Sequence, residues 1–242
     1  MRPTTLYFHG LPGSAAELAG FGPELSARTA AFHVAARRGE FASLANQIAA
    51  QSPQGPLRLV GFSLGAAAAL RVAPLLGERV EHIDLVSPAA PLQLGDFLGG
   101  MAGAPVFRAA LAGPVPFAAL TFVQAQVTCL APDRMALALM AKARGADRDL
   151  AADPQFIKAL AQSLRMSLLE QRAAYTAEIR AYVADWSPVL AEVHQPVAIW
   201  QGSEDDWTPP AMAQALAAAL PSRPQVTMIE GASHFSTLRR YL

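Results

Sequence analysis

The sequence is short of two features that would assign it to well-known classes of protein: cysteine and clustered charge. Cys129 is the only cysteine, so no disulfide can form within the chain. Lysine plus arginine and aspartate plus glutamate both number 19, which leaves a formal net charge of zero, and no block of like charge occurs. Nucleic acid is held by a strongly basic surface, so we expect no nucleic-acid partner.

The sequence also lacks an uninterrupted apolar stretch that could cross a membrane. The segment 109–132 carries no charged residue and is long enough to span a bilayer. Prolines and polar side chains interrupt it, however: Pro114, Pro116, Gln124, Gln126 and Thr128. A strand-like pattern begins at residue 4, which leaves no room for a signal peptide. We therefore expect no membrane span and, with the lone cysteine, a cytoplasmic location.

Clusters of metal-binding residues are missing as well. The five histidines are scattered, and the single cysteine has no second cysteine with which to bind a metal. His33, His82 and His194 lie in or just before predicted strands without a plausible partner nearby in the sequence, and we assign them no role. The sequence therefore predicts neither a metal ion nor an organic cofactor.

Apolar runs rich in β-forming residues alternate with helical patterns. The runs that predict strands are 4–8, 31–36, 57–61, 82–87, 197–201 and 225–229. The helical patterns are 15–28, 41–51, 64–76, 209–220 and 235–242. Strands separated by helices form parallel β-α-β units around a buried sheet. The sequence therefore predicts an α/β fold with a mostly parallel, six-stranded sheet.

The longest interval between predicted strands, 92–189, shows helical periodicity and no convincing strand. Such an insertion is typical of a helical cap over one end of a sheet, so we expect a core of residues 1–91 and 190–242 and a cap of 92–189. Apolar side chains of the cap could line an acyl pocket or form the cap's own core: Phe97, Leu98, Met101, Phe107, Leu111, Phe117, Leu120, Phe122, Met135 and Met140.

The five residues Gly-Phe-Ser-Leu-Gly at 61–65 stand between a strand pattern and an alanine-rich helical pattern. A serine on a sharp strand-to-helix turn is the arrangement of a nucleophile elbow, in which Gly61 and Gly65 avoid clashes with neighbouring backbone. Ser63 would then be exposed above the sheet, and the Leu64 amide would stabilise a negatively charged oxygen. Taken alone, the pattern also fits a glycine-rich surface turn.

A second glycine-rich turn, formed by residues 9–13, follows the first predicted strand. An oxyanion hole takes one amide from the residue after the nucleophile and another from such a loop. Leu11 is the candidate for the second amide, because Pro12 has no N–H group, and Gly13 is the reserve. The alternative is an ordinary β-turn in which His9 only packs.

Two further candidates follow the last two predicted strands. Asp205 lies in a loop before a helix for which Thr208 is the expected N-cap and Pro209 the first residue, and His234 lies in a loop near the C-terminus. Alone, the first is typical of a solvated acid and the second of an incidental histidine. Serine, acid and histidine nevertheless occur in triad order, each just past a strand whose end a parallel sheet brings to one edge.

Together these residues form a complete set for acyl transfer. Ser63 would attack the substrate, His234 would carry the proton, and Asp205 would orient and stabilise the imidazolium. The amides of Leu11 and Leu64 would bind the oxyanion. This combination favours the catalytic interpretation over three separate coincidences.

Four motifs carry a resemblance to a known family: HGLPGS, GFSLG, GSEDDWTP and GASHF. Through them the sequence resembles the α/β-hydrolase superfamily, over both predicted core segments. The resemblance implies a sheet without the two leading strands of fuller members. It is closest to small carboxylesterases, with a helical cap like that of the carrier-protein methyl ester esterases. A serine nucleophile implies ester hydrolysis rather than dehalogenase or epoxide hydrolase chemistry.

The resemblance also distinguishes three adjacent acids. Three positions separate Gly202 from Asp205, which is similar to the family's spacing of glycine to acid. Asp206 precedes the expected N-cap by two residues and should favour the positive end of that helix, and Glu204 should be solvated. The sequence departs from the family at Arg37-Arg38-Gly39-Glu40, where relatives carry an aspartate-containing loop.

We therefore expect a serine carboxylesterase that acts on a small-molecule ester of a mostly apolar acid. The candidate residues for its substrate pocket are Phe62, Phe117 and Phe122. Two alternatives stay open: hydrolysis of a carbon–carbon bond in a dienoic keto acid, and a ligand-binding homologue with negligible turnover. A cap arginine in the pocket would favour an anionic substrate, and the candidates are Arg108, Arg134 and Arg165.

Overall fold

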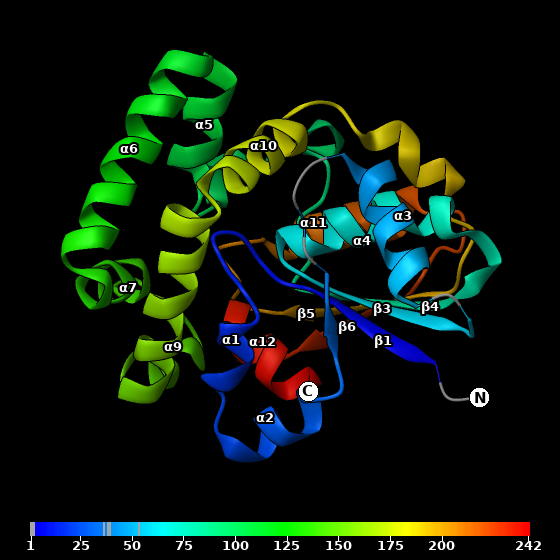
Figure 1. Ribbon diagram of the computed structural model, residues 1–242, viewed down its shortest axis with the longest axis horizontal. Helices are drawn as coiled ribbons and strands as arrows, with labels where there is room; N and C mark the ends of the chain where they lie inside the picture. The colour runs from blue at the N-terminus through cyan, green and yellow to red at the C-terminus, as the bar shows by residue number, and fades with distance from the viewer. Residues whose placement is uncertain (1–2, 36, 38–39, 53) are drawn as a thin grey trace.

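A computed structural model describes residues 3–35, 37, 40–52 and 54–242 and shows a central sheet flanked by helices (Figure 1). The six strands follow the order β2-β1-β3-β4-β5-β6, and every adjacent pair is parallel. Their bounds are β1 (Thr4–Phe8), β2 (His33–Val34), β3 (Leu57–Phe62), β4 (Val80–Val86), β5 (Val197–Gly202) and β6 (Val226–Ile229). The predicted fold class is therefore confirmed.

The edge strand β2 is shorter than the predicted strand 31–36. It pairs with β1 through Leu6↔His33 and Tyr7↔Val34, and both β2 side chains are exposed. An edge strand has a hydrogen-bonding neighbour on one side only, so its ladder ends where that one pairing ends. Ala36 lies outside the described residues, as do Arg38 and Gly39 of the loop that departs from the family pattern.

Helices cover both faces of the sheet, on the sides that right-handed crossovers require (Figure 1). One face carries α3 (Phe41–Gln51), α4 (Leu64–Leu76) and α11 (Pro210–Ala219), and the other carries α1 (Ala16–Ala19), α2 (Pro23–Thr29) and α12 (His234–Tyr241). The predicted single helix 15–28 is wrong. Gly22, with a φ of 96°, breaks the helical backbone between α1 and α2, and Pro23 then begins α2.

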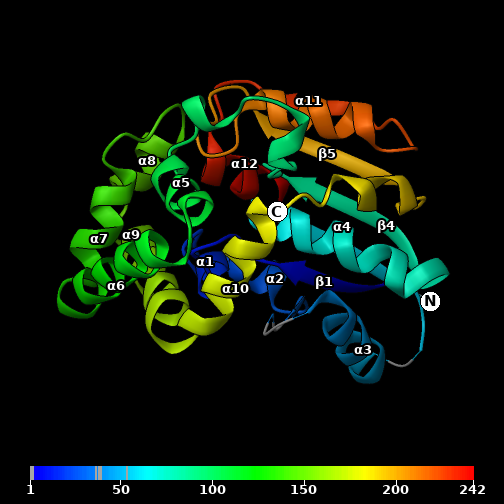
Figure 2. The ribbon, with the colours of Figure 1, turned by 90° about the horizontal axis from the view of Figure 1, so that it is seen from above.

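The segment between β4 and β5 contains helices and turns but no strand. Most of residues 92–189, called the helical insertion below, stand beyond the carboxyl ends of the strands, and the last residues run back over the sheet toward β5 (Figures 1 and 2). The main helices are α5 (Ala104–Ala112), α6 (Pro114–Leu130), α7 (Pro132–Met140), α8 (Asp147–Ala151), α9 (Pro154–Arg165) and α10 (Arg172–Val183). Short helical turns complete this part of the chain: η2 (Leu92–Leu94), η3 (Leu98–Gly100), η4 (Met166–Glu170) and η5 (Ser187–Glu192). A further short turn, η1 (Gly77–Arg79), joins α4 to β4.

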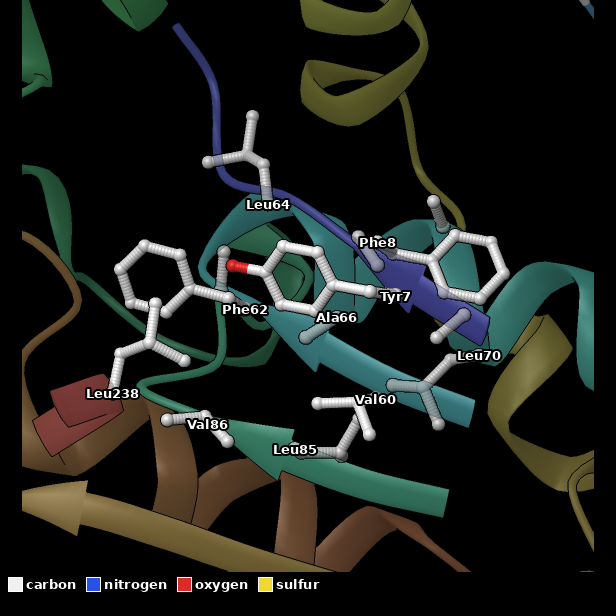
Figure 3. Packing of buried hydrophobic residues seen from close by; sticks show 14 of the residues in the cluster. Tyr7, Phe8, Val60, Phe62, Leu64, Ala66, Leu70, Leu85, Val86 and Leu238 are labelled. Carbon is white, nitrogen blue, oxygen red and sulfur yellow. The ribbon is translucent and has the colours of Figure 1, made fainter. Parts of the chain in front are cut away.

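The core fills the space between the sheet and its helices. Val60 of β3, Leu85 of β4 and Leu70 of α4 all belong to this core, and all three are fully buried (Figure 3). The alanine-rich start of α4, residues 66–69, is buried as well. Small side chains let this helix lie close to the strands, so these alanines serve packing rather than a helix surface.

Helix α6 of the insertion is rich in exposed apolar side chains. The largest exposed fractions on α6 belong to Val115 at 78% and Leu130 at 84%. Among the described residues, no single helix is both long and apolar enough to cross a membrane. The pair α6 and α7 meets the length and composition test only together, and it is bent by 117° at its break.

Candidate active site

The turn between β3 and α4 carries Ser63 at its tip. Ser63 adopts φ 55° and ψ −126°, a left-handed backbone that residues other than glycine rarely take. A Cβ added at Gly61 would lie 2.6 Å from Ala66 Cα, and one added at Gly65 would overlap the Phe8 carbonyl. The turn therefore needs glycine on both sides of its strained serine, which is the geometry of a nucleophile elbow.

We expect Gly65→Ala to lower the free energy of unfolding by about 3 kcal/mol or more, because the new methyl group meets backbone that cannot move aside. Gly99→Ala is the matched control, since a Cβ at Gly99 would have no heavy atom within 4 Å. Urea unfolding followed by circular dichroism measures both. A Gly65 variant as stable as the control would show that the close approach of α4 to β1 is not needed.

Ser63 is buried rather than exposed above the sheet, with 5% of its surface accessible, so the expectation of an exposed serine was wrong. The elbow pattern describes a local turn and contains no information on the segments that cover it. Two adjoining cavities are lined by Ser63 together with Leu11 after β1, Trp207 after β5 and Leu139 of the helical insertion.

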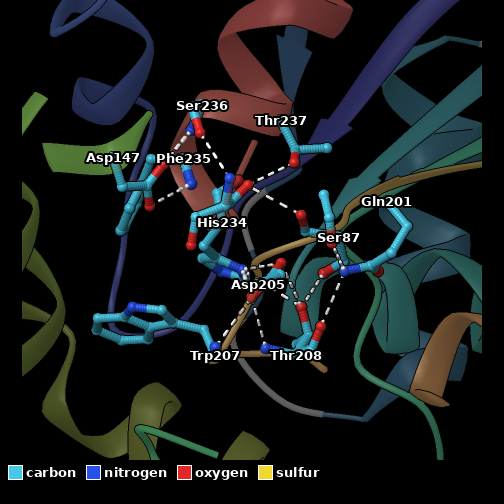
Figure 4. Close-up of polar contacts among 12 residues, drawn as sticks. Ser87, Asp147, Gln201, Asp205, Trp207, Thr208, His234, Phe235, Ser236 and Thr237 are labelled. Atoms are coloured by element: carbon cyan, nitrogen blue, oxygen red, sulfur yellow. Dashed lines mark hydrogen bonds and ion pairs between the residues drawn. The ribbon is translucent and has the colours of Figure 1, made fainter. Parts of the chain in front are cut away.

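Asp205 and His234 meet directly (Figure 4). His234 Nδ1 lies 2.9 Å from Asp205 Oδ2 and 3.2 Å from Oδ1, and both residues are buried. The backbone N–H groups of Trp207 and Thr208 each donate to Asp205 Oδ1 at 2.9 Å. The loop after β5 thus holds the carboxylate in one orientation, with its second oxygen facing the imidazole.

Aromatic side chains hold the imidazole from two sides. The ring of Trp207 stacks on His234 with 5.6 Å between centroids and 16° between planes, and the Phe62 ring lies 4.7 Å away. Because side chains pack against the imidazole on two sides, these contacts limit how far the ring can rotate. Phe62, a predicted pocket residue, is therefore buried against the imidazole.

Charge also acts on this pair. Burial alone would lower the pKa of His234, but the facing Asp205 carboxylate outweighs it and raises the pKa above the ordinary value. Burial likewise works to raise the pKa of Asp205, and the charge and hydrogen bond of His234 bring it below the ordinary value. The pair is therefore built to stabilise a protonated imidazole next to an ionised carboxylate.

Ser63 and His234 line the same narrow cavity, together with Phe62. Because Nδ1 faces Asp205, Nε2 is the ring nitrogen left to meet the serine. No hydrogen bond joins Ser63 to His234 within the described residues, and such bonds often tighten only when substrate is bound. The structure thus brings the three predicted residues together at one edge of the sheet.

The loop after β5 corrects two expectations. Helix α11 begins at Pro210 with Pro209 as its N-cap, so Thr208 does not cap it. The Thr208 hydroxyl instead lies 2.9 Å from the Ser87 carbonyl oxygen and 3.1 Å from Asp205 Oδ2. Asp206 does not serve the start of that helix either, because its carboxylate pairs with Arg144 of the helical insertion at 3.1 Å. Both differences arise from partners that lie far away in the sequence.

The two predicted oxyanion amides lie beside the serine. Leu11 and Leu64 both line the larger cavity with Ser63. Neither amide donates a hydrogen bond to another part of the chain within the described ranges. At Gly13, an added Cβ would lie 2.5 Å from the Gly10 carbonyl oxygen, so this glycine serves the tightness of the turn.

His9 packs at the other side of this turn and does not join Ser63. It is buried, and its Nδ1 lies 2.8 Å from the Gly10 carbonyl oxygen and 3.0 Å from Arg37 Nη2. Burial and the Arg37 charge lower the pKa of His9 to about 3. The neutral imidazole therefore supports the loop rather than transferring protons at ordinary pH.

Glu17 was not singled out from the sequence. Its buried carboxylate accepts a 2.6 Å hydrogen bond from the Tyr7 hydroxyl and a longer one from the Gly10 amide, and it lines the narrow cavity with Ser63 and His234. Burial raises its pKa to about 7. The only sequence feature that could have indicated a role for Glu17 is its closeness to the glycine turn. The prediction of a single helix over 15–28 gave no reason to place this side chain in the site.

A cavity of about 520 Å³ extends from Ser63 into the helical insertion. Its insertion-derived apolar lining includes Leu98, Met101, Phe107, Met135, Leu139 and Ile179. Arg108 and Lys142 also line it, while no aspartate or glutamate does in the described part of the chain. The Tyr175 hydroxyl and Gln124 Oε1 are buried and have no partner within the described residues, and both side chains belong to this lining.

The other predicted pocket residues lie elsewhere. Phe117 is buried within the insertion, and Phe122 is 53% exposed with the Arg172 guanidinium 5.9 Å from its ring centroid. Neither lines a cavity beside Ser63 among the described residues. Helical periodicity identified these rings as apolar but could not tell a core position from a pocket wall.

A wider groove of about 620 Å³ runs between α2, α8 and α12, but it contains none of the predicted site residues. Ser63 and His234 instead line the narrow cavity. Among the described residues, no three His, Cys, Asp or Glu side chains gather as metal ligands would.

Comparison with known proteins identifies the family of the chain. A family model described as serine aminopeptidase, S33, matches residues 5–237. No match was found among curated protein sequences.

Solved structures share the fold at low sequence identity. An esterase from Thermogutta terrifontis is 18% identical, with a TM-score of 0.65 over 100% of this chain and 86% of the other. A hydrolase from Oleispira antarctica is 16% identical, with a TM-score of 0.66 over 98% and 86%. A bromoperoxidase from Bacillus anthracis is 15% identical, with a TM-score of 0.65 over 100% and 88%.

Proposed function

The chain belongs to the serine aminopeptidase S33 family of α/β-hydrolases, and we propose that it is a serine carboxylesterase. The observation that carries the proposal is the strained Ser63 turn, which shares one cavity with His234, and His234 is hydrogen-bonded to Asp205. The esterase that shares this fold supports the same reaction class. An aminopeptidase would need an acid to bind a protonated amine. The 520 Å³ cavity has none in its described lining, and Glu17 in the narrow cavity already accepts hydrogen bonds from Tyr7 and Gly10.

The reaction begins when Ser63 Oγ attacks the ester carbonyl carbon and its proton passes to His234 Nε2. Asp205 holds Nδ1–H and stabilises the imidazolium. The electron pair displaced onto the carbonyl oxygen makes an oxyanion, which accepts hydrogen bonds from the amides of Leu11 and Leu64. The strain at Ser63 keeps its oxygen in this position before substrate arrives.

The tetrahedral intermediate then collapses. The carbonyl re-forms, the bond to the leaving alcohol breaks, and the imidazolium of His234 gives its proton to the departing oxygen. Water next attacks the acyl-enzyme while His234 accepts one of its protons. The second collapse releases the carboxylic acid, and Ser63 regains its proton.

The helical insertion acts as a cap in this proposal. Its apolar side chains face Ser63 across the cavity, where they would take the acyl chain of a small, mostly apolar acid. We expect rates on p-nitrophenyl esters to rise toward medium acyl lengths, and a neutral acyl chain to be preferred about tenfold over one ending in a carboxylate. Desolvating a carboxylate without a partner is costly.

Initial rates on a panel of p-nitrophenyl and methyl esters of increasing chain length test this preference. Labelling by a fluorophosphonate tests the premise, because an activated serine reacts and an idle one does not. A chain that neither labels nor turns over would be a ligand-binding homologue instead. A preference for the carboxylated ester would remove the apolar-acid assignment.

The cations in the cavity favour a second candidate, an acyl group that carries a carboxylate, as in a dicarboxylate monoester or a dienoic keto acid cleaved at a carbon–carbon bond. Arg108 and Lys142 line the cavity, and the Tyr175 hydroxyl, which has no partner in the described part of the chain, could donate to such a group. Under this candidate, Arg108→Gln raises KM about tenfold for the carboxylated ester and leaves the neutral one unchanged. Arg134→Gln is the matched control, since Arg134 is exposed and does not line the cavity.

A further inference from the structure

Four consecutive residues of the helical insertion, 144–147, contact both loops that carry the proposed acid and base. Toward the loop after β5, Arg144 Nε lies 3.1 Å from Asp206 Oδ2, and the Gly145 N–H donates to Glu204 Oε2 at 3.1 Å. These two acids flank Asp205 on either side. The segment therefore holds the neighbours of the proposed triad acid, and among the described residues it makes no hydrogen bond to that acid.

The next two residues contact the loop after β6. The Ala146 N–H donates to the Gly231 carbonyl oxygen at 2.9 Å. Asp147 Oδ2 accepts from the Phe235 N–H at 3.0 Å, and Oδ1 accepts from the Ser236 N–H at 2.6 Å (Figure 4). Asp147 is 1% exposed, so these bonds are shielded from water.

The geometry of this contact ties it to the imidazole. Helix α12 begins at His234, and Asp147 binds the N–H groups of its second and third residues, which intrahelical bonds cannot satisfy. Gly145 has a φ of 47°, and a Cβ there would lie 2.5 Å from the Gly231 carbonyl oxygen. The backbone on both sides of His234 is thus held by the insertion.

We propose that Asp147 is a positioning residue for the base of the triad, through which the helical insertion sets the orientation of His234 toward Asp205 and Ser63. The inference rests on the proposed function for its catalytic meaning. It gives the insertion a second role besides lining the cavity, because the catalytic geometry then depends on a segment that separates two helices of the cap.

Charge supports the same contact. The carboxylates whose charges act on His234 are Asp205 and, from farther away, Asp206 in the loop after β5, Asp147 in the insertion and Glu17 in α1. Burial raises the pKa of Asp147, while its bonds from Ser236 and Phe235 act in the opposite direction and favour its ionised form. The charge of Asp147 adds to that of Asp205 in raising the pKa of His234.

The test compares Asp147→Ala and Asp147→Asn with the control Asp149→Asn, an exposed acid on the same helix. Asp147→Ala should lower kcat about 10- to 100-fold with KM little changed, because the base is misplaced while the cavity is intact. Asp147→Asn keeps the shape and one acceptor, so it should recover most of that loss. The control should match the wild type.

Removing the charge has its own signature. Catalysis needs neutral His234, and the Asp147 carboxylate favours the protonated ring, so both substitutions should move the acid limb of the kcat/KM profile to lower pH. An NMR titration of the His234 ring should show the same decrease in pKa. A merely structural role would reduce the folded fraction without moving either midpoint.

The proposal is overturned if both Asp147 variants match the Asp149 control in rate and in His234 pKa. It is also overturned if their losses follow the unfolded fraction measured by circular dichroism, with the pH midpoint unmoved. If the wild type shows no turnover dependent on Ser63, the proposed function fails instead. The NMR titration then still decides whether Asp147 acts on His234, since it needs no substrate.

Discussion

Replacing Ser63 with alanine is expected to lower kcat by about four to six orders of magnitude. The substitution removes the only oxygen that the mechanism uses to form the acyl-enzyme, and neither His234 nor the oxyanion amides can replace it. The fold should persist, because the change deletes one atom and alanine tolerates the strained backbone about as well as serine does. Steady-state and single-turnover rates on a p-nitrophenyl ester measure the loss.

The control for this experiment is Ser43→Ala, the same change at an exposed position of α3. That variant should keep wild-type rates and its fluorophosphonate label, whereas Ser63→Ala should lose both. Equal stabilities in urea would show that the loss is chemical. Turnover within tenfold of wild type after Ser63→Ala would remove this serine from the mechanism.

Asp205→Asn is expected to lower kcat by about four orders of magnitude while leaving the protein folded. The carboxylate oxygen 2.9 Å from His234 Nδ1 holds the proton on that nitrogen and stabilises the imidazolium. An amide has the same shape but no charge, and its N–H₂ group would turn toward the ring and enforce the wrong tautomer. Rates on the same ester, over a range of pH, report this change.

The neighbouring acid provides a matched comparison. Asp206→Asn should cost little activity, since this carboxylate faces Arg144 rather than the imidazole, and it should cost no more than about 1 kcal/mol of stability because the pair is partly exposed to solvent. The opposite ranking of the two variants would assign the triad acid to Asp206. The assignment of the chain to the hydrolase family does not depend on that ranking.

Several properties of this protein follow from the sequence because they are local. Strand and helix patterns repeat every two or every 3.6 residues, and their alternation predicted the parallel sheet that the structure contains. Turn chemistry is local too, so the glycines around Ser63 predicted the strained turn in which this serine lies. Asp205 and His234 could be predicted as candidates for the site from local patterns as well. Each follows a strand, and a parallel sheet brings the carboxyl ends of its strands to one edge.

Local patterns did not predict the bounds of two short parts of the chain, the helices near 15–28 and the edge strand. The helical periodicity of 15–28 continued across a glycine and a proline that break it, and the exposed edge strand β2 extended less far than its β-forming residues suggested. The backbone was decided by Gly22 and by the lack of a second neighbouring strand.

The tertiary structure alone decided what surrounds the serine and what holds its partners. Ser63 is buried because distant segments cover it, and Asp206 pairs with Arg144 rather than the nearby helix. Asp147 binds N–H groups 88 and 89 residues away. Such contacts leave no periodic trace in the sequence, because the folded path of the intervening chain brings the two segments together.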